Sequence, residues 1–161
     1  MRVGLGFDVH RLVPERRLFL GGIEIPYERG LLGHSDGDVV LHAVADAMLA
    51  AACLPDIGEL FPDTDPVYRG YPSAKIAEEA VKMVRASGYE VVNIDVTVVC
   101  EQPKIIPFKQ AIKQSIAGIL GVDEFSVNVK GKTAERLGEI GAGEAIACLA
   151  VASIEEVRDE R

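Results

Sequence analysis

The chain has 161 residues, of which 48% are hydrophobic and 6% aromatic, and its formal net charge is −8. This length fits a single domain over residues 1–161, with a core of aliphatic side chains and Ala. The negative charge disfavours a nucleic-acid-binding surface, although a metal-containing cleft can still hold a phosphorylated small molecule. The three Cys residues form no CxxC pair, which predicts buried, reduced thiols in a cytoplasmic protein. No apolar segment approaches the roughly 20 residues that span a bilayer, so we expect no membrane contact.

The spacing of hydrophobic residues predicts several strands and three helices. Gly21-Gly22 lies between two short apolar runs and predicts a two-residue hairpin turn. Asp36 is the expected N-cap of the first helix, with Asp38 near the positive end of that helix. In chain order, the expected elements are a strand (3–9), a hairpin (18–20 and 23–25), a loop (30–37), a helix (38–53), a long loop (56–72), a helix (73–87), a strand (90–100), a helix that begins at Pro107 and ends before Gly121, a strand (125–129), a polar loop (130–143) and a final segment (145–157) that fits either type, for which we favour a strand.

Two of the three His residues fit a metal site together with one Asp. Asp8 and His10 are two residues apart on a predicted strand, so their side chains point to the same face. With His42, near the start of the first helix, they provide three ligands and leave a fourth position open, as in catalytic zinc sites. The second ring nitrogen of His42 can donate to Asp46 at i+4, with His34 or solvent as alternatives. Composition alone does not distinguish this site from ordinary hydrogen-bonded residues.

Three further polar segments could contribute to a site. The segment 34–38 offers free N–H groups that favour anions, or it serves only to cap a helix. The acidic and hydroxyl groups of 56–65 fit either a ligand with several hydroxyls or a solvated loop. In the segment 130–135, two Lys residues and Thr133 can hold phosphate oxygens and Glu135 a Mg²⁺ ion, although a charged surface loop is the alternative. The glycine spacing matches neither a P-loop nor a dinucleotide-binding fingerprint.

Several motifs occur together in one order: GFDVH (6–10), GG (21–22), IPY (25–27), HSDGD (34–38) continuing to His42, DIG (56–58), LFPDTD (60–65), QPK (102–104), NVK (128–130) and GE (143–144). In this order they closely resemble the 2-C-methyl-D-erythritol 2,4-cyclodiphosphate synthase family of the non-mevalonate isoprenoid pathway, over nearly the whole chain. The resemblance implies an α+β fold, with a mixed β-sheet covered by helices in a single compact domain. It also implies a homotrimer whose active sites lie between subunits.

The resemblance further implies two kinds of metal ion. By position, Asp8, His10 and His42 would bind one Zn²⁺ per subunit, and a phosphate of the substrate would fill the open position. Glu135 would bind Mg²⁺ or Mn²⁺ together with the substrate diphosphate.

The implied catalytic residues are His34 and Thr133. The implied substrate contacts extend from the methylerythritol phosphate to the cytidine: Asp8, His10, His34, Ser35, Asp56, Ile57, Gly58, Phe61, Pro62, Asp63, Thr64, Asp65, Cys100, Lys104, Ile105, Ile106, Lys132, Thr133 and Glu135. The sequence departs from the family at Lys132, where Thr is common, and at Glu139 and Ala142, where Phe and Arg are often found. The last two lie near the trimer axis of the family, so they concern a secondary ligand site rather than the chemistry.

The activity implied by the resemblance is a cyclisation. The 2-phosphate of 4-diphosphocytidyl-2-C-methyl-D-erythritol 2-phosphate attacks the β-phosphorus, which gives 2-C-methyl-D-erythritol 2,4-cyclodiphosphate and releases CMP. Such an enzyme is a phosphorus–oxygen lyase. Two alternatives remain: a metal-dependent phosphohydrolase of a nucleotide-linked substrate, in which water attacks instead, and a non-catalytic, zinc-stabilised trimeric binding protein.

Overall fold

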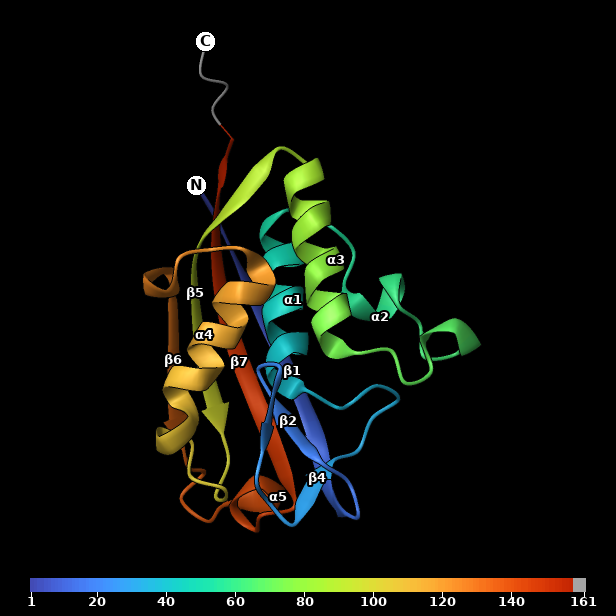
Figure 1. The fold of residues 1–161 in the computed structure, drawn as a ribbon, viewed down its shortest axis with the longest axis vertical. Coiled ribbons are helices and arrows are strands. Elements are labelled where there is room, and N and C mark those ends of the chain that lie inside the picture. Colours follow the sequence, from blue (N-terminus) through green and yellow to red (C-terminus); the bar gives the residue numbers. More distant parts are fainter. Residues whose placement is uncertain (158–161) are drawn as a thin grey trace.

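The computed structural model describes residues 1–157, in which helices cover one face of a β-sheet (Figure 1). The strands are β1 (Arg2–Pro14), β2 (Leu18–Leu20), β3 (Ile23–Ile25), β4 (Arg29–Leu31), β5 (Tyr89–Val99), β6 (Val127–Lys132) and β7 (Ala145–Glu156). The helices are α1 (Val39–Ala51), α2 (Ile57–Leu60), α3 (Ser73–Ala86), α4 (Lys109–Leu120) and α5 (Gly138–Gly141), with 3₁₀ turns at Pro66–Tyr68, Ile106–Phe108 and Glu124–Ser126. No helix in this described part is long and apolar enough to cross a membrane.

The main sheet has the strand order β4-β1-β7-β5-β6, and β2 and β3 form a separate hairpin. β5 and β6 run parallel, whereas the other neighbouring strands run antiparallel. This mixed sheet confirms the expected α+β class. The predicted domain range also includes residues 158–161, which lie outside the described residues.

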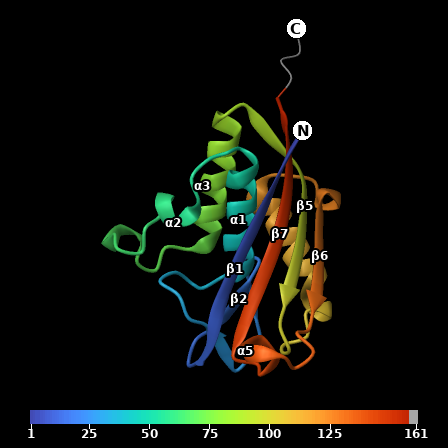
Figure 2. The same ribbon diagram turned by 180° about the vertical axis from the view of Figure 1, so that it is seen from behind.

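Within residues 1–157, one face of the sheet has no helical cover. The helices α1, α3 and α4 pack on the opposite face, and Figure 2 shows the strands in front of them. Exposed apolar side chains project from the uncovered face, which we call the open apolar face: Val3, Leu5 and Phe7 of β1 with Leu149 and Val151 of β7. Phe7 is opposite Leu149 and Leu5 is opposite Val151 in the antiparallel register, so these side chains form one patch. Contiguous exposed apolar surface of this kind is typical of an interface.

Two glycines allow α1 to lie very close to β1. A Cβ on Gly6 would lie 1.9 Å from the carbonyl oxygen of Ala43, and one on Gly4 would lie 2.2 Å from that of Ala47. Side chains alternate along a strand, so Asp8 faces the same helix as these glycines. The glycines therefore determine how closely Asp8 approaches α1.

Most predicted elements are confirmed, with shifted bounds. The final segment is the strand β7, as favoured. The predicted loop 30–37 begins inside β4, and the predicted loop 56–72 contains α2 and a 3₁₀ turn. The strand expected from Phe125 begins at Val127 instead, because Asp123 accepts a hydrogen bond from the Phe125 N–H at 2.8 Å and caps a 3₁₀ turn.

The prediction of three buried thiols is wrong for one of them. Cys100 and Cys148 are buried and free, whereas Cys53 is free and exposed. The helix α1 ends at Ala51, and Cys53 follows it with a φ of 57°. Its side chain therefore leaves the buried helix surface.

The N-cap of α1 is Asp38 rather than the predicted Asp36. The Asp38 carboxylate accepts hydrogen bonds from the N–H groups of Val40 and Leu41, and it is fully buried. It also accepts the N–H groups of the hairpin turn between β2 and β3. Burial raises the pKa of Asp38, and the backbone hydrogen bonds oppose this shift. The local sequence does not distinguish Asp38 from Asp36 as the cap, because Asp38 also accepts hydrogen bonds from the hairpin turn, which is distant in sequence.

Candidate active site

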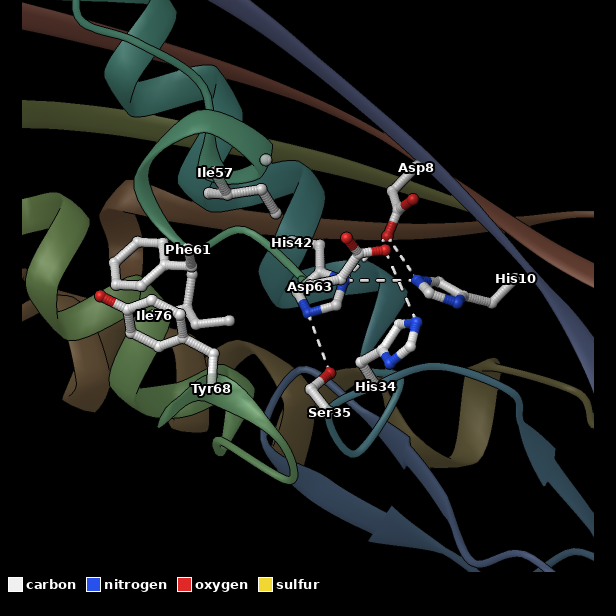
Figure 3. A pocket seen from close by; sticks show the side chains of 11 residues that line it. Asp8, His10, His34, Ser35, His42, Ile57, Phe61, Asp63, Tyr68 and Ile76 are labelled. Carbon is white, nitrogen blue, oxygen red and sulfur yellow. Dashed lines mark hydrogen bonds and ion pairs between the residues drawn. The ribbon is translucent and has the colours of Figure 1, made fainter. Parts of the chain in front are cut away.

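Three side chains converge beside the first turn of α1. Asp8 and His10 extend from β1 and His42 from α1, as Figure 3 shows. The Oδ2 atom of Asp8 lies 2.9 Å from His10 Nε2 and 2.9 Å from His42 Nδ1. The two ring nitrogens are 3.3 Å apart. One ligand atom from each residue lies within 4.8 Å of the others, so the cluster is a candidate metal site.

The hydrogen bonding of His10 shows that the cluster needs a cation or a proton between its acceptor atoms. Its Nδ1 atom lies 2.6 Å from the carbonyl oxygen of Leu32, which can only accept. Nδ1 therefore carries the proton, and Nε2 of the neutral ring directs a lone pair at Asp8. Acceptor atoms that converge in this way repel one another unless a cation or a proton lies between them.

The cluster fits a zinc ion. Zn–N bonds of 2.0–2.1 Å in a tetrahedral site put two ligand nitrogens about 3.3 Å apart, which matches the separation of 3.3 Å between His10 Nε2 and His42 Nδ1. Two imidazoles and a carboxylate are also the ligand types of catalytic zinc sites, which keep one position open.

The electrostatics keep Asp8 ionised. Without a metal, protons take the place of the cation: burial alone would raise the pKa of Asp8, but hydrogen bonds from the protonated forms of His10 and His42, and the charges of these forms, lower it to about 2. For His10, burial alone would lower the pKa, but the hydrogen bond and charge of Asp8 raise it. A carboxylate that stays ionised in this way is ready to bind a metal near neutral pH.

Asp46 does not hold the second nitrogen of His42, contrary to one sequence-based expectation. Asp46 Oδ1 instead accepts a hydrogen bond from the N–H of Ile57 at 2.9 Å, which fixes the start of α2. His42 Nε2 faces the hydroxyl oxygens of Ser73 at 2.9 Å and Ser35 at 3.3 Å. The ring turns this way because its Nδ1 atom points at Asp8. The sequence had not indicated Ser73, which is 31 residues away from His42.

The candidate metal ligands line a cavity of about 420 Å³, the metal cavity, with His34, Ser35, Ile57, Gly58, Phe61 and Asp63 among its other walls. Figure 3 shows His34 and Asp63 beside the cluster, and their side chains are 3.5 Å apart. Tyr68 and Ile76 also line this cavity, although no sequence motif indicates that they belong to a site. Ser35, in the loop before α1, lines the cavity, so one expected polar loop contributes directly to the site.

Four predicted contacts of the segment 56–65 lie outside the lining of the metal cavity: Asp56, Pro62, Thr64 and Asp65. Asp56 caps α2 through a capping box with Glu59, which positions Ile57 and Gly58 at the cavity. Asp65 caps the 3₁₀ turn that carries Tyr68. A substrate contact of these four residues stays a prediction.

Most of the predicted cytidine and phosphate contacts gather in a second cavity, but Glu135 is not part of its lining. It has a volume of about 180 Å³ and is lined by Cys100, Pro103, Lys104, Ile105, Ile106, Gly131, Lys132 and Thr133. Burial raises the pKa of the Cys100 thiol to about 11, and its S–H donates to the carbonyl oxygen of Pro103 at 3.3 Å. This thiol is therefore a wall of the cavity rather than a nucleophile.

Glu101 fixes the loop that follows β6, a role that the sequence had not indicated. Its Oε1 atom accepts the N–H groups of Ala134 at 2.9 Å and Arg136 at 3.2 Å. Within this loop, Glu135 has a φ of 51° and Arg136 a φ of 62°, an unfavourable conformation for residues with side chains. The Thr133 hydroxyl oxygen accepts the N–H of Glu135 at 3.3 Å. The Glu101 carboxylate thus fixes the backbone on both sides of Glu135, next to Thr133 in the lining of the second cavity.

A single chain does not join these two sites. The two cavities share no lining residue. The metal cavity adjoins β1 and the second cavity adjoins β6, and β7 and β5 lie between these strands. Three steps of about 4.8 Å put the two strands roughly 14 Å apart.

A third cavity, of about 360 Å³, includes Arg11, Glu139 and Glu144 in its lining. The two carboxylates disfavour an anionic ligand there. Glu139 is one of the residues at which the sequence departs from the family pattern.

The sequence matches one protein family over nearly its whole length. The model of the YgbB family matches residues 1–155. The 2-C-methyl-D-erythritol 2,4-cyclodiphosphate synthase of Aromatoleum aromaticum is 55% identical over 159 residues, which cover 99% of this chain and 96% of the relative. The synthase of the same name from Desulforamulus reducens is 53% identical over 97% of this chain and 99% of its own length.

Several solved structures are similar to this chain over nearly its whole length. The bifunctional IspDF of Campylobacter jejuni superposes with a TM-score of 0.95 at 44% identity, over 99% of this chain and 43% of that longer one. A CDP-bound 2C-methyl-D-erythritol-2,4-cyclodiphosphate synthase has a TM-score of 0.88 at 37% identity, over 96% of this chain and 100% of the other. The CDP complex of IspF from Plasmodium falciparum has a TM-score of 0.86 at 35% identity, over 98% and 97% of the two chains. The chain therefore belongs to the YgbB family, which it shares with the 2-C-methyl-D-erythritol 2,4-cyclodiphosphate synthases.

Proposed function

We propose that this protein converts 4-diphosphocytidyl-2-C-methyl-D-erythritol 2-phosphate to 2-C-methyl-D-erythritol 2,4-cyclodiphosphate and CMP, as a phosphorus–oxygen lyase of isoprenoid precursor biosynthesis. The observation that carries the proposal is the convergence of Asp8, His10 and His42 in a cavity, in a chain that is 55% identical to a synthase of that name. CDP in related structures supports a cytidine nucleotide as part of the substrate. The three free thiols support a cytoplasmic location, where thiols stay reduced.

We further propose a homotrimer in which each active site lies between two subunits. The separation of the two cavities within one chain supports this arrangement, because neither cavity alone contains both the metal cluster and the phosphate-binding Lys132 and Thr133. The open apolar face supports it too, since a second copy of the chain can cover this patch. The metal cavity of one subunit would then adjoin the second cavity of its neighbour.

Each cavity has a distinct task in this assembly. The metal cavity holds the methylerythritol phosphate, which His34 and Ser35 orient, and the segment 61–65 continues its wall. The second cavity holds the cytidine against Cys100 and the segment 104–106. Lys132 and Thr133 donate hydrogen bonds to the diphosphate oxygens, and these bonds strengthen as charge moves toward the leaving group.

The cyclisation needs alignment more than proton transfer. An oxygen of the 2-phosphate forms a bond to the β-phosphorus while the bond from the β-phosphorus to the bridging oxygen breaks, and CMP leaves with that oxygen. The attacking phosphate is already an anion, so no residue has to remove a proton from it. Zn²⁺ held by Asp8, His10 and His42, and Mg²⁺ or Mn²⁺ held by Glu135, would offset the charge of the phosphates. The side chains of the two cavities supply orientation and further charge stabilisation.

Glu101→Ala is expected to lower kcat/KM for the cytidine substrate about tenfold to a hundredfold. The variant removes two hydrogen bonds to a carboxylate, each worth about 1.5–3 kcal/mol, so Thr133 and Glu135 lose their fixed positions. Glu101→Gln keeps a carbonyl oxygen as acceptor and should stay within about threefold of the parent protein. Steady-state kinetics of both variants are the measurement. Equal kinetic constants for Glu101→Ala and the parent would show that the carboxylate does not position the loop.

The experiment that tests the function identifies the products. The purified protein is incubated with the cytidine substrate, Zn²⁺ and Mg²⁺, and the mixture is analysed by phosphorus NMR. We expect CMP and a cyclic diphosphate in equal amounts. CMP with an acyclic bisphosphate would identify a phosphohydrolase instead. Binding of CDP without any turnover would identify a non-catalytic binding protein.

A further inference from the structure

We infer that Ser73 and Asp36 act as a positioning pair that fixes the tautomer of His42 and keeps its Nδ1 atom free to bind a metal. The inference rests on the metal role proposed for His42, and it goes beyond the three ligands. The pair comes from two segments distant in sequence, the loop before α1 and the first residue of α3.

The contacts between these residues are close and buried. Ser73 is fully buried, and its hydroxyl oxygen lies 2.9 Å from His42 Nε2. The same oxygen forms a hydrogen bond with Asp36 Oδ1. The backbone N–H of Ser73 donates to Asp36 Oδ2 at 3.2 Å, so Asp36 holds Ser73 through both of its carboxylate oxygens.

The direction of each hydrogen bond follows from the available protons. An ionised carboxylate only accepts, so the single hydroxyl proton of Ser73 is donated to Asp36. The Ser73 oxygen therefore presents a lone pair to His42, and Nε2 of His42 has to be the donor. In a neutral imidazole the other nitrogen then carries no proton. That nitrogen, Nδ1, lies 2.9 Å from Asp8 Oδ2, within the candidate metal site.

The other tautomer is disfavoured in this environment. With the proton on Nδ1, the lone pairs of His42 Nε2 and Ser73 Oγ would face each other at 2.9 Å in a buried position. The contact with Ser73 therefore favours the tautomer of the neutral ring that leaves Nδ1 to the metal, once the metal takes the place of a proton between Nδ1 and Asp8. Interactions of this kind around a metal ligand are typically worth tenfold to a hundredfold in affinity.

Ser35 provides a matched control. Its hydroxyl oxygen also faces His42 Nε2, but at 3.3 Å, and it already accepts the N–H of Gly37 at 3.1 Å. Figure 3 shows this contact from the cavity side. Both residues thus offer a hydroxyl to the same nitrogen, and only Ser73 is coupled to a carboxylate at short range. We expect Ser35 to contribute little to metal affinity.

Zinc affinity and the tautomer of His42 test the inference together. Competition of Zn²⁺ alone with a chelator gives the Kd of the parent protein, Ser73→Ala and Ser35→Ala, with circular dichroism to verify folding. We expect the Kd to rise about tenfold to a hundredfold in Ser73→Ala and less than about threefold in Ser35→Ala. Equal affinities for folded Ser73→Ala and the parent would overturn the inference.

A second measurement needs no variant. Nitrogen-15 histidine spectra of the zinc-loaded parent protein should show a His42 Nε2–H proton that exchanges slowly with solvent and a metal-bound Nδ1. Metal binding through Nε2, or a proton on Nδ1, would also overturn the inference. Both measurements use zinc alone and do not depend on turnover. The inference about Ser73 and Asp36 can therefore be wrong while the protein still forms the cyclic product, and it can be right even if no cyclic product forms.

Discussion

His42→Ala is expected to abolish stoichiometric zinc binding and to lower kcat/KM by at least about a thousandfold. The variant leaves Asp8 and His10 as the two remaining protein ligands, and metal charge stabilisation is worth several kcal/mol at a phosphoryl centre. Elemental analysis and product formation of the purified variant are the measurements. His34→Ala is the matched control, because His34 lines the same cavity without belonging to the metal cluster and should retain zinc. One zinc per subunit in folded His42→Ala would remove His42 from the site.

The same variant tests whether active sites are shared between subunits. Subunits with His42→Ala keep an intact Glu135 loop, whereas subunits with Glu135→Ala keep an intact metal cluster. If one site combines both parts from neighbours, random mixing in equal amounts should make about one quarter of the sites intact in a cyclic assembly. About one quarter of the parent activity should therefore appear once the subunits have exchanged. A mixture that has demonstrably exchanged subunits and yet stays inactive would contradict shared sites.

Asp38→Ala is expected to cost about 4 kcal/mol or more of the free energy of unfolding. The Asp38 carboxylate accepts four backbone N–H groups, from Gly21 at 2.8 Å, Gly22 at 2.6 Å, Val40 at 3.1 Å and Leu41 at 3.0 Å. Loss of a helix cap costs about 1–2 kcal/mol, and each further buried N–H left without a partner costs about 1–3 kcal/mol. The variant therefore weakens α1 and separates it from the β2–β3 hairpin at the same time.

Denaturant unfolding at a fixed subunit concentration measures this loss, since assembly contributes to apparent stability. Asp123→Ala serves as the control, because Asp123 caps an exposed 3₁₀ turn through one N–H and should cost only about 0.5–1 kcal/mol. Equal losses of unfolding free energy in the two variants would show that the hydrogen bonds between Asp38 and the hairpin add no stability.

The fold was predictable wherever a short segment determines its own structure. The glycine turn at 21–22, the buried stripe of α3 and the β-branched run of β5 all have local patterns, and the structure confirms them. The cap of α1 was not predictable in this way. Asp36 and Asp38 are both good capping residues, and the choice depends on the backbone of a distant hairpin. Cys53 likewise became exposed because α1 ends two residues earlier than its sequence pattern indicates.

The candidate metal ligands were easier to predict than the residues that position the site. Asp8 and His10 share one face of a strand by simple alternation, and His42 near the start of the predicted first helix completes three ligands of the types found in catalytic zinc sites. Ser73 and Glu101 act through contacts between segments more than 30 residues apart, so no local pattern distinguishes them from other polar residues. Tyr68 lines the metal cavity because a 3₁₀ turn capped by Asp65 carries it there. The missing information was therefore tertiary in each case.

The origin of the oxygen atoms in the products tests the central claim most directly. The reaction is run in water enriched in oxygen-18, and CMP and the erythritol product are analysed by mass spectrometry. An intramolecular attack by the 2-phosphate uses no water, so neither product should gain the label during turnover. Incorporation of one labelled oxygen per turnover, in CMP or in the erythritol product, would mean that water is the nucleophile and that the protein is a phosphohydrolase.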